Sequence, residues 1–266
     1  MMRAERQAKV LQLIREREFV KNEELASIFQ VTQATIRRDL KALKELNLIR
    51  LDHGGSYDID FMAGGKEPLY ETKVYVNKEQ KRMIGQAAVE LIRDNETIIL
   101  DSGTTNLQIA HYLRNHHVEN VTVVTCDIAV THTLGSAKNI NVIVLGGILR
   151  KSFYSLYGPY TEIALRNIHA NKVFLGVDAA SMDVGVSNIV LEEVPMKQLM
   201  IQNSDQVVMV ADSMKFGINA PHKVCSWEKI DYVITDNCIE KKYIDFLDNQ
   251  GISTTLVNLS SKNCDN

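Results

Sequence analysis

The first sixty residues place apolar and polar positions in an order that predicts three short helices. Residues 8–17 carry apolar side chains at helical spacing between Arg, Glu and Gln, which is typical of an amphipathic helix. A second helix is expected to start at Asn22, because an Asn side-chain oxygen can accept a hydrogen bond from an open backbone amide. The apolar side chains expected to be buried in this helix are Leu25, Ala26, Ile28 and Phe29. After a short break, Thr32 is expected to cap a third helix that ends near Leu46.

The third helix has two distinct faces. The apolar side chains that recur at steps of four, three and three residues, and should therefore face a core, are Ile36, Leu40, Leu43 and Leu46. The polar side chains that recur on the opposite side are Gln33, Arg37, Lys41 and Lys44. The solvated face of an ordinary helix also carries Lys and Arg. Two short helices, a tight turn and a third helix nevertheless form the pattern of a helix-turn-helix motif.

A helix-turn-helix motif predicts specific contacts to double-stranded DNA. Residues near the start of the third helix reach base edges in the major groove, so Gln33, Thr35 and Arg37 are the candidate base readers. Thr32 and Arg38 are better placed for phosphate oxygens. Lys41 continues the exposed face and joins these candidate DNA contacts.

A short hairpin is expected after the third helix. Residues 48–51 alternate as a strand does, and a turn at Gly54 and Gly55 leads into a second strand. Beside a helix-turn-helix such a hairpin forms a wing, and its Arg50 and His53 would contact the DNA backbone or enter a minor groove. His53 as a turn residue without a partner is an equally good interpretation.

These motifs resemble those of a known family. The run VTQATIRRDL at 31–40, followed by LIR at 48–50 and HGG at 53–55, closely resembles the N-terminal winged helix-turn-helix of the DeoR family of bacterial transcriptional regulators. Asn47 stands where many members have glycine, and Asn also tolerates the left-handed backbone that closes a helix. The resemblance implies a winged helix-turn-helix DNA-binding domain over residues 1–57.

The chain changes character after the hairpin. Residues 58–76 have no clean period and contain Gly64, Gly65 and Pro68, so they are expected to link the first domain to one of residues 77–260. The first 55 residues carry 11 Lys and Arg against 8 Asp and Glu, a charge of +3, and the rest carries 19 against 25, a charge of −6. A basic segment on an acidic body suits a polyanionic partner, although so small an excess is also common on solvated surfaces.

The rest of the chain alternates between strand-like and helix-like segments. The predicted strands are seven short β-branched runs at residues 97–100, 121–125, 141–145, 172–177, 206–211, 232–235 and 253–257. The predicted helices are residues 78–93, 105–114, 127–137, 160–168, 193–203 and 239–248. This alternation predicts an α/β fold with a largely parallel sheet covered on both faces. In such sheets ligands bind at the carboxyl ends of the strands.

The loop after the first predicted strand is a candidate phosphate site. That strand leads directly into DSGTT at 101–105 and then into a helix. Hydroxyls and backbone amides at a helix N-terminus can hold a phosphate. Gly103 would let the backbone approach the anion, and Ser102, Thr104 and Thr105 would donate to it. Such residues also cap helices in many proteins. Three further strands end in polar or glycine loops, at 125–127, 146–147 and 176–178, which favours a pocket on this edge.

The body also resembles the effector-sensing domain of the DeoR family, which is related in fold to ribose-5-phosphate isomerase and glucosamine-6-phosphate deaminase. The matching pieces are LDSGTT at 100–105, Gly146, Gly147, Gly158, Gly185, Glu192, Glu193, Lys197, DSMKFG at 212–217 and ITD at 234–236. The resemblance implies a phosphorylated sugar as effector, with the SGTT loop on its phosphate. The other residues expected in the effector site are Asp101, Thr125, Gly146, Gly147, Asp178 and Lys215. Cys126 stands where many relatives have Asn, so either the effector differs or Cys126 is a small packed residue.

Composition and cysteine spacing narrow the class of protein. With 45% hydrophobic and 24% charged residues the chain is typical of globular proteins, and it has neither a secretory segment nor an apolar run long enough to span a membrane. Four cysteines without a CxxC pair favour a cytoplasmic protein that needs no disulfide. The histidines at 111, 116, 117 and 132 lack metal-ligand spacing. Neither a metal nor a cofactor is expected.

An active sugar-phosphate isomerase with a fused DNA-binding domain is the alternative function, because the relatives in fold are enzymes. Asp178 with Lys197 or Lys215 would supply a base beside a cation. Leu175, however, replaces one of the two acids that the isomerases pair, so no enzymatic activity is expected. The favoured reading is a homodimeric or homotetrameric repressor of a carbohydrate-utilisation operon that a phosphorylated sugar releases from DNA, with activation as the other sign of control.

Overall fold

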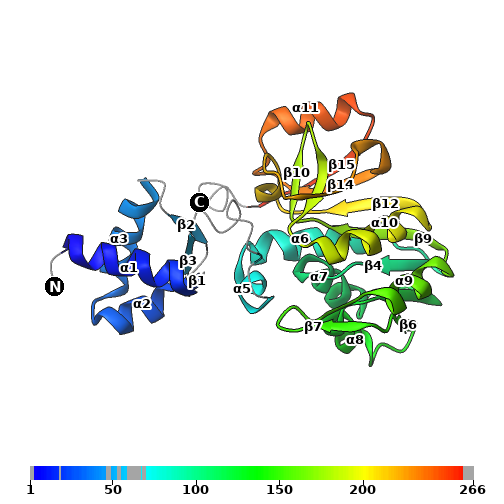
Figure 1. Ribbon diagram of the computed structural model, residues 1–266, viewed down its shortest axis with the longest axis horizontal. Helices are drawn as coiled ribbons and strands as arrows, with labels where there is room; N and C mark the ends of the chain where they lie inside the picture. Colours follow the sequence, from blue (N-terminus) through cyan, green and yellow to red (C-terminus); the bar gives the residue numbers. More distant parts are fainter. Residues whose placement is uncertain are drawn as a thin grey trace. The chain divides into compact units, whose positions relative to one another are not determined.

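A computed structural model of the chain describes residues 3–17, 19–45, 49–52, 55–58, 67 and 70–259. The chain divides into two compact units, and Asn77 and Lys78 lie on either side of the division. We call the smaller unit, up to Asn77, the head and the larger unit, from Lys78 onward, the body (Figure 1). The expected linker falls mostly outside the described residues, but its last part contains a helix, α5, at Tyr70–Tyr75.

Three helices form the core of the head, in the order that the apolar pattern predicts. They are α1 (Arg3–Arg17), α2 (Asn22–Phe29) and α3 (Gln33–Glu45). The side chains that they bury are Val10, Ile14, Leu25, Ile36, Leu40 and Leu43. Three apolar positions expected to face the core from α3 are therefore confirmed, while Leu46 lies outside the described residues. Helix α1 starts five residues earlier than its apolar period indicated.

Helix boundaries in the head confirm one expected cap and correct another. The backbone amide of Thr35 donates to Thr32 Oγ1 at 3.2 Å, so Thr32 caps α3 as expected. Asn22 is the first residue of α2 and not its cap, because Lys21 occupies the N-cap position. Asn22 Oδ1 is buried and has no hydrogen-bond partner among the described residues. Ile28, expected to be buried, is 45% exposed.

A three-stranded antiparallel sheet completes the head. Strand β2 (Ile49–Asp52) pairs with β3 (Gly55–Asp58), as the predicted wing requires. The sequence did not reveal β1 (Phe19–Lys21), which pairs with the other edge of β3. Gly55 lets the Phe19 ring pack closely, because a Cβ at that position would lie 2.3 Å from the ring and the ring would have to move. His53, Gly54 and residues 46–48 lie outside the described part of the chain.

A seven-stranded parallel sheet forms the centre of the body. Its strands are β4 (Thr97–Leu100), β5 (Val121–Thr125), β6 (Ile140–Val144), β9 (Ala170–Gly176), β12 (Ser204–Val210), β14 (Tyr232–Asp236) and β15 (Ser253–Val257). Their order across the sheet is β15-β14-β12-β9-β4-β5-β6. All seven were predicted, with ends that differ by at most two residues. The order reverses between β4 and β9, because β5 and β6 extend the sheet on one side and the later strands on the other.

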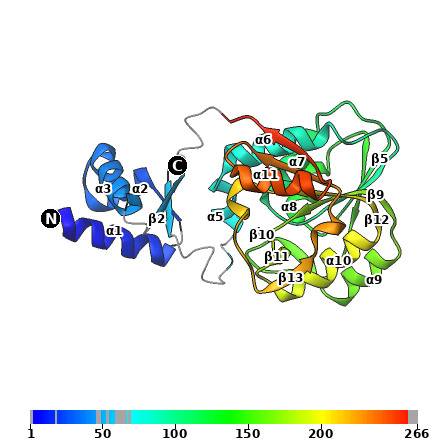
Figure 2. The ribbon, with the colours of Figure 1, turned by 90° about the horizontal axis from the view of Figure 1, so that it is seen from above.

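Helices cover both faces of this sheet, which confirms the expected doubly wound α/β fold. One face carries α6 (Lys78–Val89), α7 (Thr104–Leu113) and α8 (Ile128–Leu134), and the other carries α9 (Pro159–Arg166), α10 (Val194–Gln202) and α11 (Lys241–Asn249). Helices α9 and α10 lie side by side, and Asn203 after α10 donates to the Leu165 carbonyl of α9 at 3.1 Å (Figure 2).

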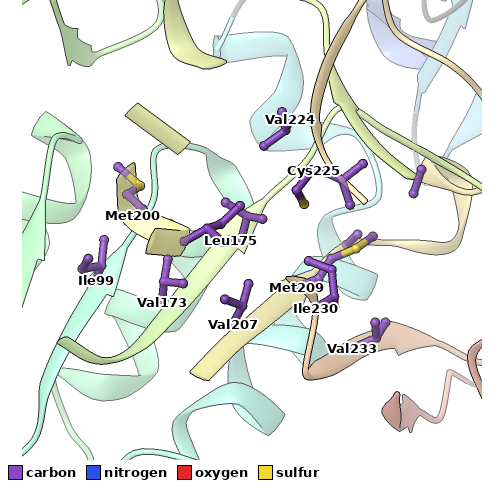
Figure 3. Close-up of a cluster of buried hydrophobic side chains, with 14 of the residues drawn as sticks. Ile99, Val173, Leu175, Met200, Val207, Met209, Val224, Cys225, Ile230 and Val233 are labelled. Atoms are coloured by element: carbon purple, nitrogen blue, oxygen red, sulfur yellow. The ribbon is translucent and has the colours of Figure 1, made fainter. Parts of the chain in front are cut away.

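Alternating strand residues supply the two halves of the core. Val173 and Leu175 of β9 and Val207 and Met209 of β12 project to one side of the sheet, where Met200 of α10 packs against them (Figure 3). The intervening residues of the same strands fill the other half. This alternation is the period of two that buried strands require.

Short strands and 3-10 turns at the edge of the sheet were not predicted. The additional strands are β7 (Ile148–Arg150), β8 (Ser155–Tyr157), β10 (Ala179–Ser181), β11 (Gly185–Asn188) and β13 (His222–Cys225). The short turns are η1 (Leu191–Glu193), η2 (Ser213–Lys215) and η3 (Trp227–Lys229). Segments of three or four residues are too short to show a period, which is why the sequence pattern missed them.

Two further properties bear on the class of protein. In the part of the chain that the structure describes, none of the helices combines the length and the apolar character needed to cross a membrane. Cys126 and Cys225 are buried free thiols, but Cys238 is in a disulfide, so the expectation that the chain has none is wrong at this position.

Candidate functional site

Helix α3 presents its polar face to solvent. The expected DNA contacts that are exposed on or beside it are Thr32, Gln33, Arg37, Arg38 and Lys41. Thr35 is only half-exposed, and its hydroxyl lies 3.0 Å from that of Thr32, so this pair orders the start of the helix. The Arg50 side chain and all of His53 lie outside the described residues, and their roles stay predictions.

A buried acid behind this face was missed in the sequence. Asp39, in the middle of the TIRRDL run, is 1% exposed, and Arg6 of α1 donates to it at 2.5 Å. Gln7 makes a longer contact of 3.4 Å with the same carboxylate. Because Arg6 balances Asp39, the acid joins α1 to α3 and does not cancel the cations on the exposed face. Its partner is 33 residues away, so no local spacing could identify it.

Carboxylates gather at the carboxyl edge of the sheet in the body. The buried acids that follow or end five of its strands are Asp101, Asp127, Asp178, Asp212 and Asp236. The point where strand order reverses, between β4 and β9, lies among them, and open α/β sheets bind ligands at such a point. This edge is therefore the candidate effector site.

A buried ion pair joins the two strands at that reversal. Lys197 of α10, 4% exposed, contacts Asp101 Oδ2 and also donates to the Gly176 carbonyl at 2.8 Å. Backbone amides of Ser102 and Gly176 donate to the two Asp101 oxygens at 2.8 and 3.0 Å. Burial alone would lower the pKa of the Lys197 ammonium, but the carboxylates of Asp101 and Glu193 outweigh it and raise the pKa. Lys197 thus stays charged, and Asp101 holds the loop in place.

The SGTT loop is held by a second acid. Gly103 has a φ of 129°, which favours glycine, and its amide donates to Asp127 Oδ2 at 2.9 Å. The other Asp127 oxygen caps α8 by accepting from Ala129 and Val130. Burial raises the pKa of Asp127 to about 6. The Ser102 and Gly103 amides already donate to carboxylates. The expected phosphate contacts are therefore restricted to the later residues of the loop.

The open donors of this loop belong to the first turn of α7. The amides of Thr104, Thr105 and Asn106 begin this helix and have no acceptor within it. The side-chain amide of Asn106 is fully buried, and neither its oxygen nor its nitrogen has a partner among the described residues. A Cβ at Gly176 would lie 3.3 Å from Asn106 Nδ2, which places this amide beside the β4–β9 reversal. Asn106 was not predicted, although it follows SGTT directly.

A third acid, Glu193, connects this edge to the β7–β8 hairpin. Arg150 of β7 lies 2.5 Å from Glu193 Oε1, and Asn188 donates to Oε2 at 2.9 Å. The Arg150 guanidinium also stacks over the Phe153 ring, 3.9 Å from its centroid. Ser155 of β8 approaches the same carboxylate at 3.5 Å. Glu193 was expected only as part of the family resemblance, and Arg150 and Asn188 gave no signal in the sequence.

Three of the expected effector residues make contacts that support the fold. Thr125 is fully buried, and its hydroxyl accepts from the Asp127 amide at 3.1 Å. The Gly146 carbonyl accepts from Thr161 Oγ1 at 2.7 Å. A Cβ at Gly147 would lie 2.2 Å from that same hydroxyl, so this position needs glycine for packing. Each of these contacts joins parts of the fold to one another, and a role of the three residues as ligands stays a prediction.

The remaining expected residues lie on the same edge. Asp178 follows β9, and its carboxylate accepts from the Ile189 amide at 3.0 Å. Lys215 is half-buried in η2, after β12. Cys126 is fully buried, and burial together with the nearby acids raises the pKa of its thiol well above the usual value. This is the environment of a small packed residue and not of a reactive thiolate.

Comparison with known proteins identifies both units. A family model described as a DeoR-like helix-turn-helix domain matches residues 6–60, and one described as the DeoR C terminal sensor domain matches residues 76–237. The chain belongs to the DeoR family. The helix-turn-helix match contains α3 with its exposed cations, and the sensor-domain match contains the sheet edge where the buried acids lie.

Named relatives of this DeoR-family chain are transcriptional repressors. The glycerol-3-phosphate regulon repressor of Escherichia coli (strain K12) is 32% identical and covers 89% of this chain and 92% of its own length. The HTH-type transcriptional repressor GlcR of Bacillus subtilis (strain 168) is 31% identical over 95% of both chains. Among solved structures, a D-ribose-5-phosphate isomerase in complex with phospho-erythronic acid covers 52% of this chain and 54% of its own, with 12% identity and a TM-score of 0.40.

Proposed function

We propose that this DeoR-family protein represses carbohydrate-utilisation genes by binding operator DNA, and that a phosphorylated sugar bound in the body releases it. The observation that carries the effector half of the proposal is the first turn of α7. Its three open amides and the Asn106 side chain, which has no partner among the described residues, lie beside the Asp101–Lys197 ion pair, where an anion would find several donors.

An anionic ligand can bind at this edge because the two acids nearest the loop are already compensated. Lys197 neutralises Asp101, and three backbone amides share the charge of Asp127. The dipole of α7 adds partial positive charge at the same point. A phosphate would therefore meet donors first, while Asp178 and Lys215 stand on the same edge to contact sugar hydroxyls.

The DNA half of the proposal rests on α3. Arg37, Arg38 and Lys41 are exposed on a helix that follows a tight turn, which is the geometry of a recognition helix in the major groove. Relatives with repressor names share this arrangement of head and sensor over nearly their whole length. Repression is accordingly the sign of control that we propose.

Release by an effector requires that the ligand favours an arrangement with weaker DNA affinity. A homo-oligomer provides one, because two heads on one operator gain affinity from effective concentration and lose it when they are misaligned. The protein is therefore proposed to act as a homodimer or homotetramer.

A binding experiment with matched variants at Thr104 tests this function. Sites would be enriched from a random duplex library with the full-length protein, and their release would be followed by fluorescence anisotropy against sugar phosphates and the corresponding free sugars. We expect release by a phosphorylated sugar but not by its unphosphorylated form. Thr104→Asp, which places an anion where the phosphate would lie, should bind DNA normally and lose this response, and Thr104→Ser should keep it.

Two outcomes would contradict the proposal. Failure to enrich any duplex site would remove the DNA-binding role, and a normal response from Thr104→Asp would show that the phosphate lies elsewhere.

A further inference from the structure

Exposed apolar side chains are concentrated on one part of the body. Among the described residues, ten large hydrophobic side chains are exposed, and eight of them fall between residues 128 and 163. These eight, which we call the apolar surface, are Ile128, Ile143, Val144, Ile148, Leu149, Tyr154, Tyr160 and Ile163. Single exposed apolar residues are ordinary on a monomer, but a concentration of this kind marks an interaction site.

Close contacts join several of the elements that carry this surface. The Ile128 amide donates to the Tyr154 carbonyl at 2.9 Å, which holds the start of α8 against the β7–β8 hairpin. A Cβ at Gly158 would lie 3.4 Å from Ile148 Cδ1, so the hairpin also touches the start of α9. Strand β6, the hairpin and α8 lie together in Figure 1, at the opposite end of the sheet from β15. The apolar residues thus lie on neighbouring elements at one end of the sheet.

The edge strand β6 is a central part of this surface. It is the last strand in the sheet order, so one row of its backbone amides and carbonyls has no partner strand in the described chain. Ile143 and Val144 are 44% and 45% exposed. Because consecutive strand residues point to opposite faces, both faces of this strand end are partly exposed in the described structure. Exposed apolar edges of this kind aggregate unless a partner covers them.

The charge of the surface points to a second copy of the chain as that partner. Residues 139–149 contain no charged side chain, and only Arg150 and Lys151 are charged in residues 139–161, whereas 24% of the whole chain is charged. Arg150 is turned inward to Glu193. In a twofold interface each residue meets the same patch, so a surface with repeated like charges would repel itself. Apart from Lys151, residues 139–161 can pack against their own copy without burying an unpaired charge.

We propose that the apolar surface is the site where a second copy of this chain docks, through β6, the β7–β8 hairpin and α9. The inference rests on the proposed function in one respect, since a repressor that reads two half-sites needs two heads. It adds the surface by which the bodies associate.

Glutamate substitutions in two different elements test the inference. The full-length protein, Ile148→Glu in β7 and Tyr160→Glu in α9 would be compared by gel filtration with light scattering at micromolar concentration. Tyr160 is 75% exposed, so its substitution leaves the internal packing intact. Leu191→Glu, at a position 58% exposed but outside the apolar surface, is the matched control.

We expect the unmodified protein and Leu191→Glu to have the mass of a dimer or a multiple of it. Both test variants should form a smaller species, with association weakened by about 30-fold or more, the size of an interface hot spot, and with an unchanged circular dichroism spectrum. A monomeric unmodified protein, or a wild-type mass for Tyr160→Glu, would overturn the inference. Neither result depends on DNA or effector, so the proposed function is tested separately.

Discussion

The head and the body use charge in opposite ways. The head exposes its cations on α3 and buries the acid Asp39 against Arg6. The body buries acids and cations together at the sheet edge, where Lys197 and Arg150 contact Asp101 and Glu193. A large polyanion can reach only exposed charges, whereas a small ligand can be enclosed. The difference therefore fits the size of the partner that we propose for each unit.

Because of this difference in burial, charges in the head should affect partner binding and charges in the body should affect folding stability. Exposed charges are solvated, so their removal changes affinity for a partner more than it changes folding. Buried charges have already lost their water, and removal of one partner leaves the other without compensation. Substitutions in the two units should therefore affect different measurements.

Removal of the buried cation should give the largest effect. Lys197→Met leaves Asp101 in a site that is 2% exposed with no opposite charge in contact, so we expect the body to lose about 3–5 kcal/mol of unfolding free energy. Trp227, the only tryptophan, is buried in the body, and its fluorescence would follow urea unfolding of that unit.

Lys242→Met is the control for this experiment. Lys242 also contacts an acid, Glu240, at 2.7 Å, but both side chains are more than half exposed. Its stability should stay that of the unmodified protein. Equal losses of unfolding free energy in the two variants would show that the buried ion pair matters no more for stability than the exposed one.

The second effect is a dependence of stability on pH. Burial raises the pKa of Asp127 to about 6 from an ordinary value of 3.8, so the folded chain holds this proton more tightly than the unfolded chain. The group therefore costs stability above pH 6, and this cost of about 3 kcal/mol disappears as the pH falls from 6 to 4. Asp127→Asn cannot titrate, so urea unfolding at several pH values should show the unmodified protein gaining on the variant as the pH falls. Parallel curves for the two proteins would show that Asp127 has an ordinary pKa.

The smallest effects belong to the exposed face of the head. Arg37→Ala removes a proposed base reader and should weaken binding to an enriched site by about 1–3 kcal/mol, with loss of preference at the contacted base. Lys41→Ala should weaken binding to all sequences alike and lower the salt dependence by about one charge. Neither should change unfolding by urea. If Arg37→Ala lost affinity uniformly across sequences, Arg37 would be a phosphate contact.

Much of the fold followed from local patterns. The three helices of the head and the seven strands of the body bury apolar side chains at regular periods, and these were located within a few residues of their ends. The caps were predicted less well, since Thr32 does cap α3 but the expected cap at Asn22 is wrong. The small strands at the sheet edge were missed because three residues are too few to show a period.

The candidate site was predictable only where it is local. The SGTT loop directly follows a buried strand, so its place at the end of that strand can be predicted from the sequence. Lys197 and Asp101 are 96 residues apart, and Arg150 and Glu193 are 43 apart. Such pairs depend on how the strands are ordered, which residue spacing does not encode. The structure also shows that Thr125 and Gly147 have packing roles, a distinction that needs their neighbours.

The β7–β8 hairpin has one more consequence. Leu149 faces solvent and the next residue, Arg150, reaches inward to Glu193, so two adjacent positions of one strand connect the interior of the body to its outer surface. A ligand that drew Arg150 away from Glu193 would shift β7, and the exposed residues of that strand would move with it. The change would then cross a single strand, and the rest of the sheet could remain rigid while the spacing of the subunits in the proposed dimer changed.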